Sequence, residues 1–246
     1  MVWFASDIHL GGGEAAVARA TERRFVAWLD RAAREAHTVV LAGDVFDFWF
    51  EYGRVVPQGC VRALGKLAEL TDRGLRVVFF TGNHDMWVGD YLARECGLEI
   101  HTRPEVLELE GQRIFVAHGD NMNIRGDLKL VLLNKIFRSR MLRRLFAWGV
   151  HPDLAMRFGR WWSDRSRRSH PETSFTEALT EPLIDYARGY VAGGGRVDHF
   201  VFGHMHYARD YREAGLHTIH LGGWDRCASY AVLDGAGALT LRAEEP

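Results

Sequence analysis

The sequence predicts a layered α/β fold in which two packed β-sheets are covered by helices. Short runs rich in Val and Phe recur along the chain, and each is followed by a polar cluster. Helix-like spacing of apolar residues separates the first three runs, whereas the C-terminal third has strand-like runs joined by Gly-rich turns. Alternating strands and helices are typical of a layered fold. With 246 residues, 47% of them hydrophobic, the chain can bury a large core, and we expect one domain over residues 1–246.

Five of the apolar runs have the length and composition of buried strands. They cover residues 2–5, 38–42, 75–81, 114–117 and 200–202. Residues 14–36 and 57–73 carry apolar side chains at helical spacing, with Pro57 suited to a first turn and Gly74 to a helix end. Three more strands are predicted near the C-terminus, at residues 217–221, 229–233 and 239–242.

A long segment, about residues 124–169, interrupts this pattern and is expected to be a helical insert. Between Arg125 and Arg168 it has 12 basic and 3 acidic residues, a net charge of +9. The rest of the chain has 19 basic and 29 acidic residues, a net charge of −10, so the formal charge of −1 hides a strongly dipolar molecule. Large apolar residues such as Leu145, Trp148 and Trp161 are interleaved with the basic ones.

Composition also excludes several classes of protein. The three cysteines, Cys60, Cys96 and Cys227, are widely spaced, which argues against a disulfide framework or a cysteine-based zinc site. The N-terminus enters a strand at once, so we expect no signal peptide. No run approaches the ~18 apolar residues that a membrane span needs. We therefore expect a cytoplasmic protein that can contact a membrane from one side.

Seven side chains of metal-ligand type lie in the polar clusters that follow the five strands. They are Asp7, His9, Asp44, Asn83, His118, His204 and His206. The carboxyl ends of strands in an open α/β sheet meet at one edge, so these side chains can converge. Mixed oxygen and nitrogen ligands without thiolate suit Mn²⁺, with Zn²⁺ or Fe as alternatives. Two such ions ~3.5–4 Å apart can clamp a phosphate group, so we expect two divalent metal ions.

The order of the motifs D-x-H, G-D-x-x-D, G-N-H-D, H-G-D and G-H-x-H resembles the calcineurin-like metallophosphoesterases, from Asp7 to His206. The resemblance implies a four-layer α/β/β/α sandwich with an inserted helical cap. The first implied metal is bound by Asp7, His9, Asp44 and His206. The second is bound by Asp44, Asn83, His118 and His204, so that Asp44 bridges the two. His84 is the implied general acid, oriented by Asp85.

Within that family, the sequence resembles the UDP-2,3-diacylglucosamine hydrolases, pyrophosphatases of lipid A biosynthesis. The shared features are the opening S-D-I-H-L, G-D-V-F-D with its aromatic tail, the insert after H-G-D, and L-G-G-W before the last strands. The resemblance implies cleavage of UDP-2,3-diacylglucosamine to UMP and 2,3-diacylglucosamine 1-phosphate (lipid X). Candidate substrate contacts are Asn83, His84, Arg125, Asp127 and Lys129. The best-known branch of this group differs in having Arg at the position of His84.

The insert is open to more than one interpretation. Basic, amphipathic, aromatic helices can lie on an anionic bilayer, and their apolar faces can cap a site and hold acyl chains. A lid with a solvated basic face, or a surface for single-stranded nucleic acid, has a similar composition. We expect a lipid-linked nucleotide sugar as substrate and an anionic membrane surface as partner, with no nucleic acid and no obligate protein partner.

Other functions remain open from the sequence alone. The chain could be another phosphoesterase that acts on a soluble nucleotide or a phosphoprotein, or a nuclease of the same fold. A non-catalytic scaffold is disfavoured because all seven ligand positions and His84 are present. The aromatic residues within 46–52 fit either a helix packed on the core or an apolar wall of the substrate site.

Overall fold

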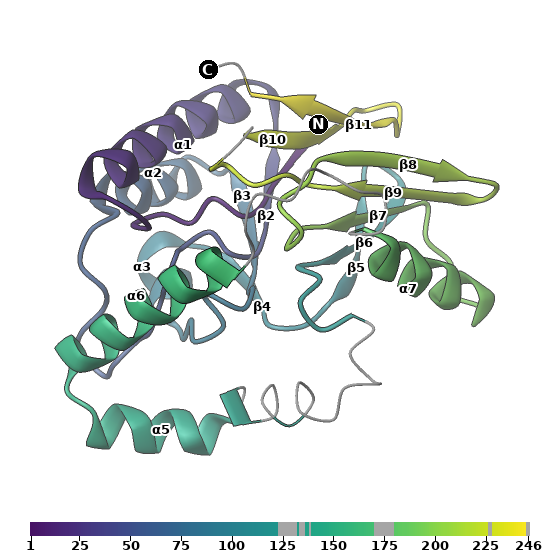
Figure 1. The fold of residues 1–246 in the computed structure, drawn as a ribbon. Coiled ribbons are helices and arrows are strands. Elements are labelled where there is room, and N and C mark those ends of the chain that lie inside the picture. The colour runs from purple at the N-terminus through teal and green to yellow at the C-terminus, as the bar shows by residue number, and fades with distance from the viewer. Residues whose placement is uncertain (123–131, 133–135, 138, 170–179, 226–227, 245–246) are drawn as a thin grey trace.

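The computed structural model describes residues 1–122, 132, 136–137, 139–169, 180–225 and 228–244. Its central feature is a pair of β-sheets packed face to face (Figure 1). The first sheet has the strand order β11-β10-β1-β2-β3-β4. Its strands are β1 (Val2–Ala5), β2 (Thr38–Ala42), β3 (Arg76–Phe80), β4 (Glu99–His101), β10 (Ser229–Leu233) and β11 (Leu239–Ala243). Strands β1 to β4 are parallel, whereas β10 and β11 add an antiparallel edge.

The second sheet has five strands in the order β5-β6-β7-β9-β8. They are β5 (Glu105–Leu109), β6 (Gln112–Ala117), β7 (His199–Phe202), β8 (Arg209–Glu213) and β9 (Leu216–His220). The central strands β6, β7 and β9 are parallel, and the two edge strands are antiparallel to their neighbours. The parallel strands of both sheets therefore end on the same side of the molecule. The predicted ligands lie in the loops that follow these strand ends.

Helices cover the outer face of each sheet and complete four layers. The first sheet is covered by α1 (Ala15–Glu35), α2 (Val61–Asp72) and α3 (Tyr91–Cys96), and the second by α7 (Glu181–Ala192). One core joins Trp28 and Leu67 to the first sheet, another joins Leu183 to Phe200 of the second, and a third lies between the sheets. The expected four-layer α/β/β/α arrangement is confirmed.

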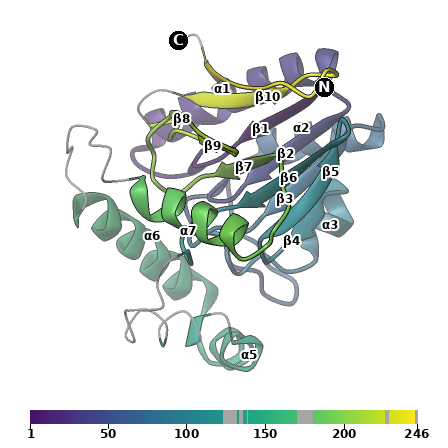
Figure 2. The ribbon, with the colours of Figure 1, turned by 90° about the vertical axis from the view of Figure 1, so that its right-hand side faces the viewer.

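The described part of the insert contains two helices, α5 (Arg140–Gly149) and α6 (Pro152–Ser169). Both lie at one end of the sandwich in the two views (Figures 1 and 2). They contact the aromatic loop formed by residues 46–52. The Tyr52 hydroxyl donates to the Val150 carbonyl at 3.1 Å, and the rings of Phe50 and Phe146 lie 5.3 Å apart. The insert is thus docked on the loop that follows β2.

One expectation about local structure was wrong. Helix α2 begins at Val61 rather than at Pro57, because Gly59 (φ 96°) and Cys60 (φ 54°) are left-handed and break the helical path. Of the two alternatives for residues 46–52, the helix is excluded, because this segment forms a loop with isolated bridges. Among the described helices, none combines the length and the apolar character needed to cross a bilayer.

Candidate metal centre

The seven predicted ligands lie together where parallel strands of both sheets end. Asp7 and His9 follow β1, Asp44 follows β2 and Asn83 follows β3. From the second sheet, His118 follows β6, and His204 and His206 follow β7. Among the described residues, donor atoms fall into three mutually close groups, within 4.8 Å in each. These are Asp7–His9–His206, His9–Asp44–His84 and Asp44–His118–His204.

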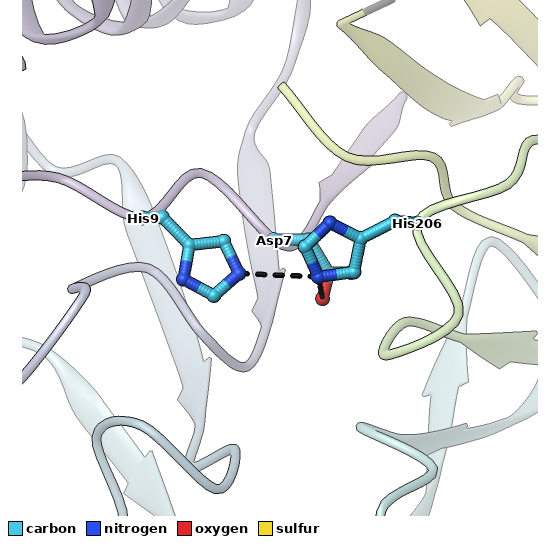
Figure 3. Close-up of side chains that lie close together, drawn as sticks. All are labelled: Asp7, His9 and His206. Carbon is cyan, nitrogen blue, oxygen red and sulfur yellow. Dashed lines mark hydrogen bonds and ion pairs between the residues drawn. The ribbon is translucent and has the colours of Figure 1, made fainter. Parts of the chain in front are cut away.

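The first group joins the beginning of the chain to the loop after β7 (Figure 3). The Nε2 atoms of His9 and His206 face each other at 3.3 Å, and Nε2 of His206 lies 3.5 Å from Oδ1 of Asp7. Asp7 is fully buried, and its carboxylate also accepts the backbone N–H of His204 and the hydroxyl of Ser6. Three side chains with lone pairs therefore converge in a small polar space.

The third group, Asp44–His118–His204, is built around His118, which is almost fully buried. Its Nδ1 is 3.1 Å from the Ala42 carbonyl, which can only accept, so Nδ1 carries a proton. In the neutral ring, Nε2 is then a bare acceptor that faces Asn83 Oδ1 at 3.1 Å and Asp44 Oδ2 at 3.3 Å. Electron-rich atoms at such distances repel each other unless a proton or a metal ion lies between them, and this donor set fits a divalent metal.

The electrostatics of the same atoms show how strongly the site favours positive charge. Burial alone would lower the pKa of His118, but Asp44, followed by Asp7 and Asp120, raises that pKa to about 10. Burial would raise the pKa of Asp44, but His118, followed by His84 and His9, holds it well below its ordinary value. A proton on His118 supplies the positive charge that a metal ion would otherwise provide.

His204 completes the third group as a neutral imidazole. Burial, followed by the nearby charge of His118, lowers the pKa of His204 to about 4. At neutral pH its imidazole therefore keeps a nitrogen lone pair available for a metal. The ring centroids of His204 and His118 lie 5.1 Å apart in an edge-to-face arrangement, so both nitrogens reach the same space.

Asp44 lies between the first and third groups. Its Oδ2 is 3.3 Å from Nε2 of His118 and 3.9 Å from Nε2 of His9, and its Oδ1 accepts the backbone N–H of His84 at 2.8 Å. This position between ligands of both groups is what a bridging carboxylate needs.

The backbone around the site is held in uncommon conformations. Seven non-glycine residues of the described chain have positive φ, and five of them belong to the predicted ligand set. These five are Asp7, His9, Asp44, His204 and His206. A positive φ costs free energy outside glycine and is retained where a function requires it. The strain therefore coincides with the candidate metal centre.

Glycines allow the ligand side chains to approach neighbouring backbone. A Cβ on Gly43 would lie 2.6 Å from Nδ1 of His118, and a Cβ on Gly223 would lie 2.6 Å from Nδ1 of His206. A Cβ on Gly82 would collide with the carboxylate of Asp44. Gly43 and Gly82 belong to the motifs that the sequence singled out, whereas the role of Gly223 was not anticipated.

The residue that orients His84 differs from the expectation. Nδ1 of His84 donates to the backbone carbonyl of Asp47 at 2.8 Å. The carboxylate of Asp85 instead accepts backbone N–H groups, from Gly82 at 2.7 Å and Val45 at 2.8 Å. Asp85 is fully buried. Its carboxylate connects the two loops that carry Asp44 and Asn83, because it accepts a backbone N–H group from each loop.

Two polar contacts of the site were missed in the sequence. Oδ1 of Asp225 lies 3.5 Å from Nδ1 of His206, and the hydroxyl of Ser163 in α6 donates to Oδ1 of Asp47 at 2.7 Å. Neither Asp225 nor Ser163 lies in a recognised motif, so the spacing of residues in the sequence did not indicate that they contact the site. Three predicted substrate contacts, Arg125, Asp127 and Lys129, lie outside the described residues.

Comparisons with known proteins show what the chain is similar to. The family model described as calcineurin-like phosphoesterase matches residues 1–208. A protein of Porphyromonas gingivalis named UDP-2,3-diacylglucosamine hydrolase is 37% identical, over 95% of this chain and 94% of its own. A protein of the same name from Ralstonia nicotianae is 30% identical, over 91% of this chain and 84% of its own. Among solved structures, an archaeal phosphodiesterase covers 99% of both chains at 11% identity and a TM-score of 0.49.

Proposed function

The chain belongs to the calcineurin-like phosphoesterases, and from this we propose that it hydrolyses UDP-2,3-diacylglucosamine to UMP and 2,3-diacylglucosamine 1-phosphate. As a member of that family it is a metal-dependent hydrolase. The observation that carries the substrate assignment is the identity of 37% over nearly the whole length of a relative with that named activity. The insert is included in that match, since it covers 95% of the chain.

The proposed metal ligands are the seven residues that converge at the strand ends. Asp7, His9, Asp44 and His206 would hold one ion. Asp44, Asn83, His118 and His204 would hold the other. Bound divalent ions, for which we propose Mn²⁺, would neutralise the pyrophosphate charge and lower the pKa of a water molecule. The residues themselves fix the geometry: His118 keeps its Nδ1 proton on the Ala42 carbonyl and directs Nε2 into the site.

His84 is the proposed general acid. Its Nδ1–H is held by the Asp47 carbonyl, which leaves Nε2 as the atom that can carry a transferable proton in the imidazolium form. When water adds to phosphorus it loses a proton to the solvent, the bond from phosphorus to the leaving oxygen breaks, and the Nε2 proton passes to that oxygen. A proton from the solvent then restores the imidazolium. The site thus needs a protonated His84 at the start of each turnover. Asn83 and His84 are also proposed to contact the substrate phosphates.

The insert is proposed to serve as the acyl-binding cap and membrane-facing surface. Several of its large apolar side chains are exposed, including Trp148 at 89%, Leu145 at 57% and Trp161 at 53%. Exposed aromatic and aliphatic residues in a segment with a net charge of +9 suit an anionic bilayer that carries the lipid substrate. We propose a peripheral location on the inner face of the cytoplasmic membrane, with the whole chain acting as one domain.

Product analysis tests this function. We expect Mn²⁺-loaded protein to convert UDP-2,3-diacylglucosamine to UMP and a diacylated sugar monophosphate in equal amounts, as followed by phosphorus NMR. Intact substrate after prolonged incubation would exclude the assignment. The nuclease alternative predicts salt-dependent binding to DNA and cleavage of it, so the same preparation should be tested with single- and double-stranded DNA at low salt.

A further inference from the structure

We propose that docking of the inserted helix α6 positions His84, with Ser163 and Asp47 as the positioning residues that connect the two. Three observations support it: the close approach of one face of α6 to the loop after β2, a buried hydrogen bond from that face to Asp47, and a second hydrogen bond from His84 to the Asp47 carbonyl. The inference rests on the proposed function in one respect, namely that His84 protonates the leaving group. It adds a residue of the insert to the determinants of that step.

Helix α6 approaches the loop after β2 along a face of small side chains. Ala155, Gly159 and Ser163 are spaced four residues apart, so they lie on one side of the helix. Ala155 is fully buried and Ser163 is 1% exposed. A Cβ at Gly159 would collide with the ring of Phe48, so glycine is required for this approach. The small side chains bring the helix close enough for Ser163 to reach the loop.

The contact made by Ser163 is a buried bond to a carboxylate. Its Oγ donates to Oδ1 of Asp47 at 2.7 Å, and Asp47 is only 4% exposed. Hydrogen bonds to a carboxylate are stronger than neutral ones, and burial removes competition from water. The side chain of Asp47 is therefore fixed in part by a helix that lies 116 residues further along the chain.

The main chain of Asp47 in turn fixes His84. The Asp47 carbonyl accepts the Nδ1 proton of His84 at 2.8 Å, which sets both the tautomer and the plane of the ring. Oδ1 of Asp47 also lies 3.6 Å from Nδ1 of His9. One residue thus faces the insert, the proposed acid and a proposed metal ligand. A shift of Asp47 would turn the His84 ring away from the leaving oxygen.

The consequence is a catalytic step that depends on the position of the insert. If the insert also holds the acyl chains, binding of the lipid substrate favours the docked position of the insert, in which His84 is oriented toward the leaving oxygen. When the insert is not docked, His84 is poorly oriented and hydrolysis is slow. Substitution of Ser163 should uncouple the orientation of His84 from the position of the insert, and it changes none of the proposed metal ligands.

The test uses two uridine 5′-(aryl phosphate) esters that lack acyl chains, one releasing 4-nitrophenol and one releasing phenol. The nitrophenolate leaves readily as an anion, whereas phenolate needs a proton. For Ser163→Ala we expect kcat on the phenyl ester to fall about tenfold, with little change on the nitrophenyl ester and unchanged metal content. His84→Ala should show the same selectivity more strongly, and the double variant should lose little beyond His84→Ala, since the two residues act through one group.

Ser139→Ala is the matched control, because it removes a serine hydroxyl from the same insert at the start of α5. Its phenyl-to-nitrophenyl rate ratio should equal that of the unmodified protein. An unchanged ratio in Ser163→Ala, or an equal loss on both esters, would overturn the positioning role. The outcome does not depend on the lipid assignment: a protein that ignores UDP-2,3-diacylglucosamine can still show, or fail to show, the ester selectivity.

Discussion

The imidazoles of His9 and His206 face each other with 3.3 Å between their Nε2 atoms, although 197 positions separate them in the sequence. They come from different sheets, since His9 follows β1 and His206 follows β7. Two imidazoles at this distance can share one proton or bind one cation. A metal bound there would tie the N-terminal strand to the second sheet, so occupancy of the site and stability of the fold should be linked.

The first prediction concerns Gly82. A Cβ there would collide with the Asp44 carboxylate, so Gly82→Ala should displace this proposed bridging ligand without removing any donor atom. We expect metal content to fall and the rise in unfolding temperature on adding Mn²⁺ to be lost. Gly65→Ala is the control, because its Cβ would meet open space in helix α2. It should keep the metal response and gain about 0.5–1 kcal/mol of stability. Equal metal binding by both variants would contradict the account.

His84→Ala should separate catalysis from metal binding. We expect kcat on the phenyl ester of uridine 5′-phosphate, whose leaving group needs a proton, to fall by about 10²–10⁴, the usual contribution of a general acid. Metal content, measured by elemental analysis, should change little because His84 is not among the seven proposed ligands. Asn83→Ala provides the contrast, since it removes a proposed ligand and should lower both quantities. Parallel loss of metal and activity in His84→Ala would refute the acid role.

Trp148 is the most exposed of the large apolar residues described, at 89%. If the insert faces a bilayer, Trp148→Ser should weaken binding to vesicles rich in anionic lipid by about tenfold, because a buried aromatic ring contributes roughly 1.5–3 kcal/mol. Val191→Ser on α7 is the control, as it removes an exposed apolar side chain outside the insert. Sedimentation with vesicles would measure both, and identical binding would count against a membrane-facing insert.

A fourth prediction concerns stability against pH. His220 is fully buried at the end of β9, and neither ring nitrogen has a hydrogen-bond partner among the described residues. Burial, followed by the charge of Arg209, lowers the pKa of His220 to about 4 from an ordinary 6.5. The stability associated with the neutral ring is therefore complete above pH 6.5 and is lost as the pH falls toward 4, by up to about 3 kcal/mol.

His220→Leu should remove that part of the pH dependence. Urea unfolding at pH 7 and pH 4.5, in the presence of EDTA, should show a smaller loss of unfolding free energy for the variant than for the unmodified protein. Because both proteins keep His204, whose pKa is also lowered to about 4, only the difference between them is informative. Equal losses would show that His220 does not titrate in this range.

Much of the fold was predictable because its strands are short, apolar and bounded by polar motifs. The limits of β1, β2 and β10 match the expected ones. Strand β8 was missed because Arg209–Glu213 is a polar edge strand without an apolar signature. The short β4 was missed for a similar reason, since three residues at a sheet edge carry little pattern.

The site was predictable in its composition but not in the contacts that orient it. All seven predicted ligands lie together, as the strand ends required. Adjacency in sequence favoured Asp85 as the partner of His84, but the turn after β3 directs Asp85 to backbone N–H groups instead. The true partner, the Asp47 carbonyl, is a main-chain atom, so no residue pattern could have indicated it.

The central claim is that the site acts on a lipid-linked nucleotide sugar. It is tested most directly by kcat/KM of the Mn²⁺-loaded protein for UDP-2,3-diacylglucosamine, UDP-N-acetylglucosamine and a simple aryl phosphate under the same conditions. We predict efficient release of UMP from the diacylated substrate, at least about a hundredfold above the other two, since an acyl-binding insert contributes several kcal/mol to transition-state binding. Preference for the aryl phosphate or the soluble sugar nucleotide would contradict the lipid assignment while leaving the metal centre intact.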